Sequence, residues 1–248
     1  MKKIVFVLLI LILTTVPAMA KTTISFPANY GQDNFKSLST ELGIAISYDP
    51  LSPAEPLGGL LPGFDAGVEV TDVQISKDSA FWSQAVQGSS IPSSLTFPKV
   101  HVQVGLPVIP LDLGLMYSEV PNTDIKLIGG GLKFAILRGD VAIPAVAIRG
   151  AYTKLSGIDE LDMETKSLDL SISKGFLIFT PYAGIGEVWI TSTPQGSAVT
   201  VANLKKEDIT ETKEFIGAKI TFFPLLNLVA EADFSKVNAY SLRLNLHF

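Results

Sequence analysis

Few residues in this sequence could support nucleophilic catalysis, because the chain has no cysteine and only two histidines. His101 lies between Lys99 and Gln103 at alternate positions of a polar face, where an imidazole could activate a serine. His247 lies on a polar face near the end of the chain. Serines are numerous, but no spacing singles one out. The sequence therefore predicts no catalytic residue.

Metal and cofactor chemistry also lacks a motif. Without cysteine, thiolate zinc sites and iron–sulfur clusters are excluded. The acidic stretches 160–162 and 207–208 lack the spacing of a calcium loop, and no Lys-Ser/Thr follows Gly129–Gly131 to make a phosphate loop. We expect no metal and no cofactor. The formal net charge of −5 argues against a nucleic-acid partner, which would need a basic face.

Charged side chains gather on one face of the segments described below, and acids outnumber bases there. With His101, this face carries Asp65, Glu69, Asp112, Asp169, Glu187, Glu231 and Asp233, set against Lys99, Lys133, Arg149, Lys219 and Arg243. We predict that these residues face the lumen of a barrel. They would then form either a network of ion pairs that seals the lumen or a narrow, mildly cation-preferring conduit.

The elements that carry this face are strands, as hydrophobic alternation with period 2 indicates. In Val100–Leu106, Leu111–Tyr117 and Leu168–Ile172, a large apolar residue occupies every second position. The chain is 47% hydrophobic and 17% charged, with a mean hydropathy of +0.38, yet beyond residue 20 no apolar run approaches the ~18 residues of a spanning helix. A soluble core would need a second sheet to bury so much apolar surface, whereas a bilayer would cover it.

The first twenty residues have the features of a secretory signal peptide. Lys2 and Lys3 precede an apolar run, Ile4–Leu13, and Ala18–Ala20 forms a small-x-small cleavage site. We expect residues 1–20 to be removed on export.

The last segment carries a family resemblance. Its apolar and aromatic residues alternate perfectly and end on an aromatic, at Tyr240, Leu242, Leu244, Leu246 and Phe248. With the signal peptide and the repeated strands, it resembles the Gram-negative outer-membrane β-barrel proteins. The resemblance implies an outer-membrane location, contact with lipid, and recognition of these five residues by the barrel-assembly machinery.

We therefore expect an all-β, antiparallel, up-and-down transmembrane barrel of about ten to twelve strands. Short connections near 107–110, 138–141, 173–176 and 223–225 alternate with longer ones, as that topology requires. The barrel is assigned to residues 42–248, with Leu42–Tyr48 as a candidate first strand, and twelve strands fit slightly better than ten. Residues 21–41 are an N-terminal segment that could be a short helix with an Asp33 cap or a plug. The role of residues 74–94 is left open.

Three functions remain. The first is an integral outer-membrane barrel that is not an enzyme, either structural or a narrow, porin-like channel or transporter for small or hydrophobic solutes. The second is a lipid-modifying enzyme of the outer membrane, with His101 as base. The third is a soluble periplasmic, lipocalin-like carrier, which would not explain the apolar face or the last strand.

Overall fold

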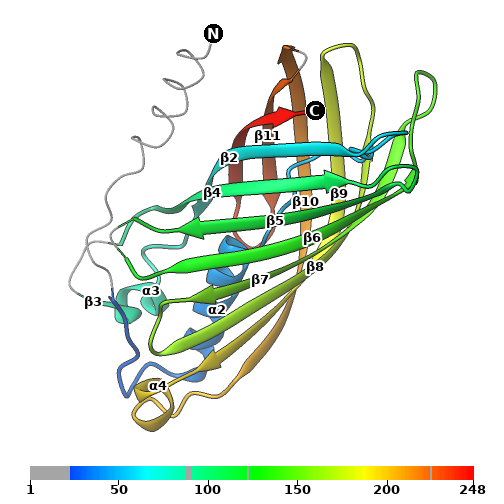
Figure 1. Cartoon of the computed structure of the whole chain (residues 1–248). Coiled ribbons are helices and arrows are strands. Elements are labelled where there is room, and N and C mark those ends of the chain that lie inside the picture. The colour runs from blue at the N-terminus through cyan, green and yellow to red at the C-terminus, as the bar shows by residue number, and fades with distance from the viewer. Residues whose placement is uncertain (1–22, 88–90, 122, 224) are drawn as a thin grey trace.

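The computed structural model describes residues 23–87, 91–121, 123–223 and 225–248 (Figure 1). The predicted signal peptide, residues 1–20, lies outside the described residues. No helix in the described part of the chain is long and apolar enough to cross a membrane.

The main body is a closed antiparallel barrel of ten strands, each paired with its neighbours along the chain. These strands are β2 (Gly63–Gln74), β4 (Ser94–Gly105), β5 (Leu111–Glu119), β6 (Lys126–Leu137), β7 (Ala145–Ser156), β8 (Leu161–Ser173), β9 (Phe179–Pro194), β10 (Glu207–Phe223), β11 (Leu226–Phe234) and β12 (Ala239–His247). The barrel closes where β12 pairs with β2, with Leu242 opposite Val70. The fold class is as predicted, but the slight preference for twelve strands over ten is not met.

Three helices and a small sheet complete the structure. The helices are α2 (Gln32–Ile46), α3 (Ala80–Ala85) and α4 (Ser197–Thr200), while β1 (Thr23–Ile24) pairs with β3 (Val86–Gln87). Residues 74–94, for which the sequence predicts no role, thus contain α3 and β3.

The prediction of a strand at Leu42–Tyr48 is wrong, because most of this segment is the second half of α2. A short apolar run does not distinguish a strand from a fully buried helix by periodicity. Every residue from Leu38 to Tyr48 is buried, since the helix lies inside the barrel and is covered on all sides. The barrel therefore begins at Gly63 rather than at residue 42. Asp33 lies in the first turn of α2, but the N-cap residue is Gly31, without a side-chain cap.

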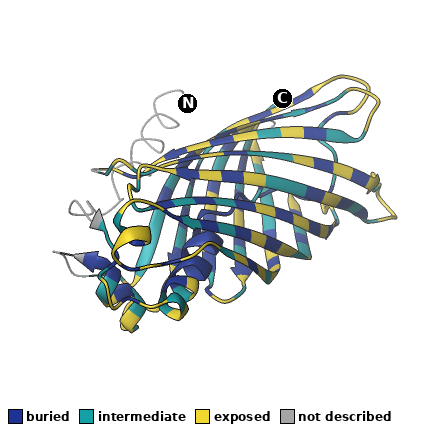
Figure 2. Cartoon of the chain, turned by 90° about the horizontal axis from the view of Figure 1, so that it is seen from below, coloured by how far each residue is buried: buried dark blue, intermediate teal, exposed yellow. Residues whose placement is uncertain are grey.

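The outer face of the barrel is an apolar band. Its large side chains are each between 41% and 63% exposed, as at Val100, Val102, Leu113, Leu115, Leu132, Phe134, Ile148, Leu168, Leu170, Ile172, Ile185, Ile216, Leu242 and Leu246. Figure 2 shows the alternation of exposed and buried residues along the strands. In water this surface would be strongly unfavourable, so a hydrocarbon environment is its natural partner.

The apolar band ends at a different residue on each strand. On β8, β9 and β10, the first polar residues of the outer face beyond the band are Lys166, Glu187 and Glu214. Aromatic residues lie near its edges, as expected for interfacial girdles. Tyr117 donates a hydrogen bond to Glu119, and Tyr152 donates one to Glu164, both on the outer face. Four further aromatic residues are also exposed, at Phe222, Phe234, Tyr240 and Phe248.

The two ends of the barrel differ. The turn end has the connections that follow β4, β6, β8 and β10, and the loop end has the two longest connections, which follow β2 and β9. Phe248 lies at the turn end, where its backbone exchanges hydrogen bonds of 2.6 and 2.9 Å with Phe64 at the start of the first barrel strand.

Replacing Leu244 with Arg tests the apolar band, because Leu244 faces outward near the middle of β12. We expect a loss of about 2–4 kcal/mol in the free energy of unfolding. Urea titration of the barrel folded in lipid vesicles measures this. The control is Thr212→Arg, on the outer face of β10 beyond the band, which should cost about 0–1 kcal/mol. Equal losses in the two variants would contradict the assignment.

Candidate functional site: the filled lumen

The lumen is occupied by the chain's own N-terminal segment, residues 32–57, which we call the plug. It starts at the loop end, where the Gln32 side chain bonds the backbone of Lys205 at 2.9 Å in both directions. It reaches the turn end, where the Leu57 N–H donates to both carboxylate oxygens of Asp112 at 3.0 and 3.1 Å. The plug therefore runs the length of the barrel, with α2 in its first half and an extended segment in its second.

The loop-end half of the lumen is a hydrophobic core. Phe35, Leu38 and Leu42 of α2 belong to one buried cluster with Val188 and Ile190 of the wall. The fit is close at Gly43, since a Cβ there would come within 2.4 Å of the Ile190 side chain. This helix therefore needs a glycine at the point where it touches the wall.

The two largest buried polar side chains of this half that touch α3 are paired. Glu41 accepts hydrogen bonds from the Trp82 indole at 2.7 Å and from the Ser76 N–H at 3.0 Å, which ties α2 to segment 75–93. The Tyr30 hydroxyl donates to the Phe81 carbonyl at 2.6 Å. Burial raises the pKa of Tyr30. Its hydroxyl therefore keeps its proton, and this hydrogen bond, at any ordinary pH.

The turn-end half is polar, and most of its charges are paired. Lys99 contacts Glu69 at 2.9 Å, Lys133 contacts Asp112 at 3.0 Å and Arg149 contacts Asp169 at 2.5 Å. All six side chains are at most 4% exposed. A barrel of ten strands is only slightly wider than the eight-stranded barrels that side chains fill, so charges in it are forced together.

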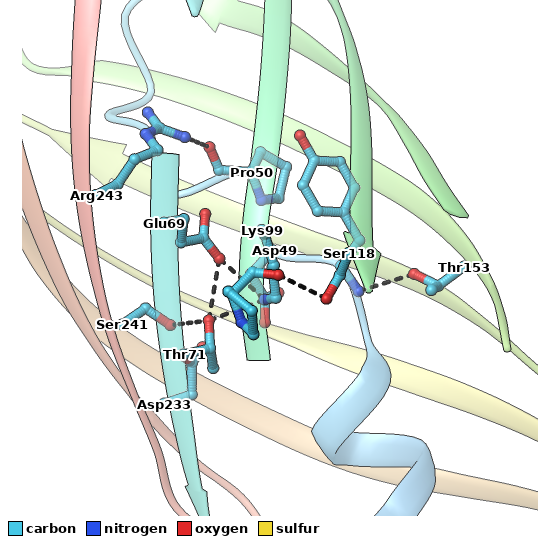
Figure 3. A network of polar contacts seen from close by, with 12 residues as sticks. Asp49, Pro50, Glu69, Thr71, Lys99, Ser118, Thr153, Asp233, Ser241 and Arg243 are labelled. Atoms are coloured by element: carbon cyan, nitrogen blue, oxygen red, sulfur yellow. Dashed lines mark hydrogen bonds and ion pairs between the residues drawn. The ribbon is translucent and has the colours of Figure 1, made fainter. Parts of the chain in front are cut away.

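Several of these wall side chains also hold the plug. Lys133 donates to the carbonyls of Pro53 at 2.8 Å and Glu55 at 2.7 Å, while Arg243 donates to the Pro50 carbonyl at 2.8 Å. Figure 3 shows Arg243 directed at Pro50, and Lys99 beside Glu69 and Thr71. Because residues 47–57 are neither helix nor strand, their carbonyls accept no hydrogen bonds from a helix or strand backbone. The wall cations supply the hydrogen bonds that secondary structure would otherwise provide.

Twelve of the thirteen residues predicted to face the lumen do so. Eleven are buried on the inner face, namely Asp65, Glu69, Lys99, His101, Asp112, Lys133, Arg149, Asp169, Glu231, Asp233 and Arg243. Lys219 lies half-buried in the inward phase of β10.

The prediction for Glu187 is wrong, because it lies exposed on the outer face of β9 between Ile185 and Trp189. β9 continues beyond the apolar band, where the outside is polar. Its inward neighbours there, Val188 and Ile190, are apolar because they pack on α2. A polar residue of an alternating strand therefore predicts the lumen only on the part of the strand whose opposite face belongs to the apolar band.

Two charged residues of the lumen, Lys213 and Asp49, are not among those predicted from the sequence. Lys213 lies on β10, which begins at Glu207 and leaves only residues 195–206 as the connection from β9. Alternation of Ile209, Lys213 and Phe215 in phase with the rest of β10 could have indicated the longer strand. Nothing in the sequence places Asp49 of the plug against Lys213, with which it forms an ion pair.

His101 takes part in the lumen network. Its Nε2 lies 2.9 Å from Asp65 Oδ1, and this is the one side-chain hydrogen bond that it makes within the described residues. Asp65 also accepts a hydrogen bond from Asn245 and lies 4.0 Å from Arg243. The imidazole therefore serves here as a hydrogen-bonding member of the wall.

Comparisons with known proteins give structural likeness only. No protein-family model matches the sequence, and no curated protein matches it. Among solved structures, the chain is similar to the translocator domain of the autotransporter NalP from Neisseria meningitidis, with 11% identity and a TM-score of 0.42 over 88% of this chain and 98% of that one. It is also similar to the outer-membrane protease OmpT from Escherichia coli, with 8% identity and a TM-score of 0.36 over 75% and 96%.

A third similar structure is Ail of Yersinia pestis, with 12% identity and a TM-score of 0.30 over 75% of this chain and 97% of that one. The resemblance to Gram-negative outer-membrane β-barrels is confirmed at the level of the fold, which is a closed antiparallel barrel with an apolar outer face.

Replacing Lys99 with Met tests the buried network, since it leaves Glu69 as an unpaired charge in the lumen. We expect a loss of about 3–5 kcal/mol in the free energy of unfolding, and recovery of most of it in the double variant with Glu69→Leu. Urea titration measures both. Lys154→Met, which breaks an exposed pair with Asp162, should cost less than about 1 kcal/mol. A double variant as unstable as Lys99→Met would show that the loss does not come from the unpaired carboxylate.

Proposed function

We propose that this protein is an integral outer-membrane barrel, closed by its own plug, that binds small apolar solutes at its loop end. The observation that carries the proposal is an apolar cavity between α2, α3 and the inner wall. The apolar band supports the membrane location, and the longer loops support an outward-facing loop end.

The cavity has a volume of about 60 Å³. Ile46 of α2 and Trp82 of α3 line one side, and Phe97 and Leu155 of the wall line the other. Cavities lined by aliphatic and aromatic groups stay dry and accept apolar guests, and an engineered cavity of ~150 Å³ accepts benzene. This cavity therefore suits solutes of a few carbon atoms, while larger guests would require α3 to shift.

Passage through the lumen would require the plug to move. The turn-end half is filled by ion pairs and by the extended part of the plug, which favours a closed barrel over the open conduit considered above. The extended part is held by the ion pair of Asp49 with Lys213 and by hydrogen bonds to charged wall side chains, each worth about 1.5–3 kcal/mol net.

The test uses tryptophan fluorescence, because the chain has two tryptophans and one of them lines the cavity. In a Trp189→Phe variant, Trp82 is the only reporter. We expect bromoethane to quench it saturably in the purified, folded protein, since a bound bromine would lie against the indole. A cavity-filling change, Val120→Phe, should abolish saturation and leave only collisional quenching.

Quenching that stays linear with bromoethane concentration in both proteins would refute solute binding and leave a structural barrel. A shift of gel mobility on boiling serves as the check that each variant is folded.

A further inference from the structure

We propose that the lumen holds a hard divalent cation, of the calcium class, between Asp49 of the plug and Glu231 and Asp233 of the wall. The inference does not depend on solute binding. Glu231 and Asp233 are two residues apart on β11, so both point inward from the same strand, and Asp49 approaches them from the plug.

The spacing of the three carboxylates suits a calcium ion. One oxygen from each of the three carboxylates lies within 4.8 Å of the other two. Calcium–oxygen distances are ~2.3–2.6 Å, so ligands on opposite sides of one ion lie up to roughly 4.6–5.2 Å apart. Three carboxylates at this spacing can share one ion, and the remaining coordination positions would be taken by water or carbonyl oxygens.

A second observation points to a missing ligand. Both carboxylate oxygens of Glu231 are buried without a hydrogen-bond partner, and so are Oδ1 of Asp233 and the hydroxyl of Tyr182, which neighbours Glu231. Glu231 and Asp233 are 4% and 3% exposed. Buried carboxylates without partners are costly, and native proteins pair them or use them to coordinate metals. Elsewhere in the network, Glu69, Asp112 and Asp169 each have a cation within 3.0 Å.

The local charges are also unbalanced. Lys213 pairs with Asp49 and has its Nζ 4.0 Å from Asp233 Oδ1, so the one ammonium beside the trio contacts two of its three carboxylates. Arg149 is engaged with Asp169 through Nε. The local excess is therefore two negative charges, which a divalent cation would neutralise.

Water offers the competing arrangement. Nη1 and Nη2 of Arg149 have no partner either, so water could bridge this guanidinium to Glu231 and satisfy both without a metal. The two arrangements differ in what Lys213 does. In the cation site it competes with the metal for Asp49 and Asp233, whereas in the water-bridged arrangement it is a necessary counter-ion.

The test is calcium titration of the full, folded chain after removal of metal with EDTA, followed by calorimetry and thermal unfolding. We expect one calcium per chain and a higher unfolding temperature in its presence. Glu231→Gln should weaken binding at least about tenfold, because it removes a charged ligand at constant size. Lys213→Gln should strengthen binding at least about tenfold, because it removes the competing cation.

Glu69→Gln is the matched control, since it removes a buried lumen carboxylate outside the trio and should leave calcium affinity unchanged. Absence of binding up to about 10 mM calcium, or equal affinity in Glu231→Gln and the unmodified chain, would overturn the proposal in favour of the water bridge. If Glu231→Gln does not fold, Lys213→Gln decides alone. Affinity that fails to rise in that variant would overturn the cation site.

Discussion

The structure depends on a single constraint, which is that backbone carbonyls and N–H groups facing lipid or buried in a filled lumen need hydrogen-bond partners. The wall meets it by closing, through the pairing of β12 with β2. The plug meets it in two ways. α2 satisfies its own backbone, whereas the extended residues after Ile46 rely on Lys133, Arg243 and other wall side chains. The lumen charges are thus the connection between wall and plug.

This division explains why the two halves of the lumen differ in chemistry. A helix can pack against an apolar inner wall, so the loop-end half has the residues of a soluble core, such as Leu38 and Ile190. An extended segment needs donors, so the turn-end half has lysines and arginines, and these in turn need carboxylates such as Glu69 and Asp112. The apolar cavity lies in the first half and the carboxylate trio in the second, each in the half whose chemistry suits it.

Much of the fold and of the lumen could be predicted from the sequence, because period 2 sorts residues by face wherever lipid covers one side of a strand. The prediction failed where that premise failed. Glu187 is polar yet outward, because β9 extends beyond the apolar band at that height. Leu42–Tyr48 alternates yet is mostly helical, because the barrel buries all its faces. Asp49 could not be placed, since its contact with Lys213 joins residues far apart in the chain that no local pattern connects.

The most direct test of the filled lumen is a disulfide between plug and wall, in a chain that otherwise has no cysteine. The Oγ atoms of Ser39 on α2 and Ser192 on β9 lie 2.8 Å apart and are buried. With cysteines at both positions, we predict near-complete cross-linking of the membrane-inserted protein under mild oxidation, read from gel mobility with and without reductant. Ser39→Cys paired with Thr212→Cys, on the outer face, should not cross-link. Failure of the Ser39–Ser192 pair in a folded barrel would contradict the plug.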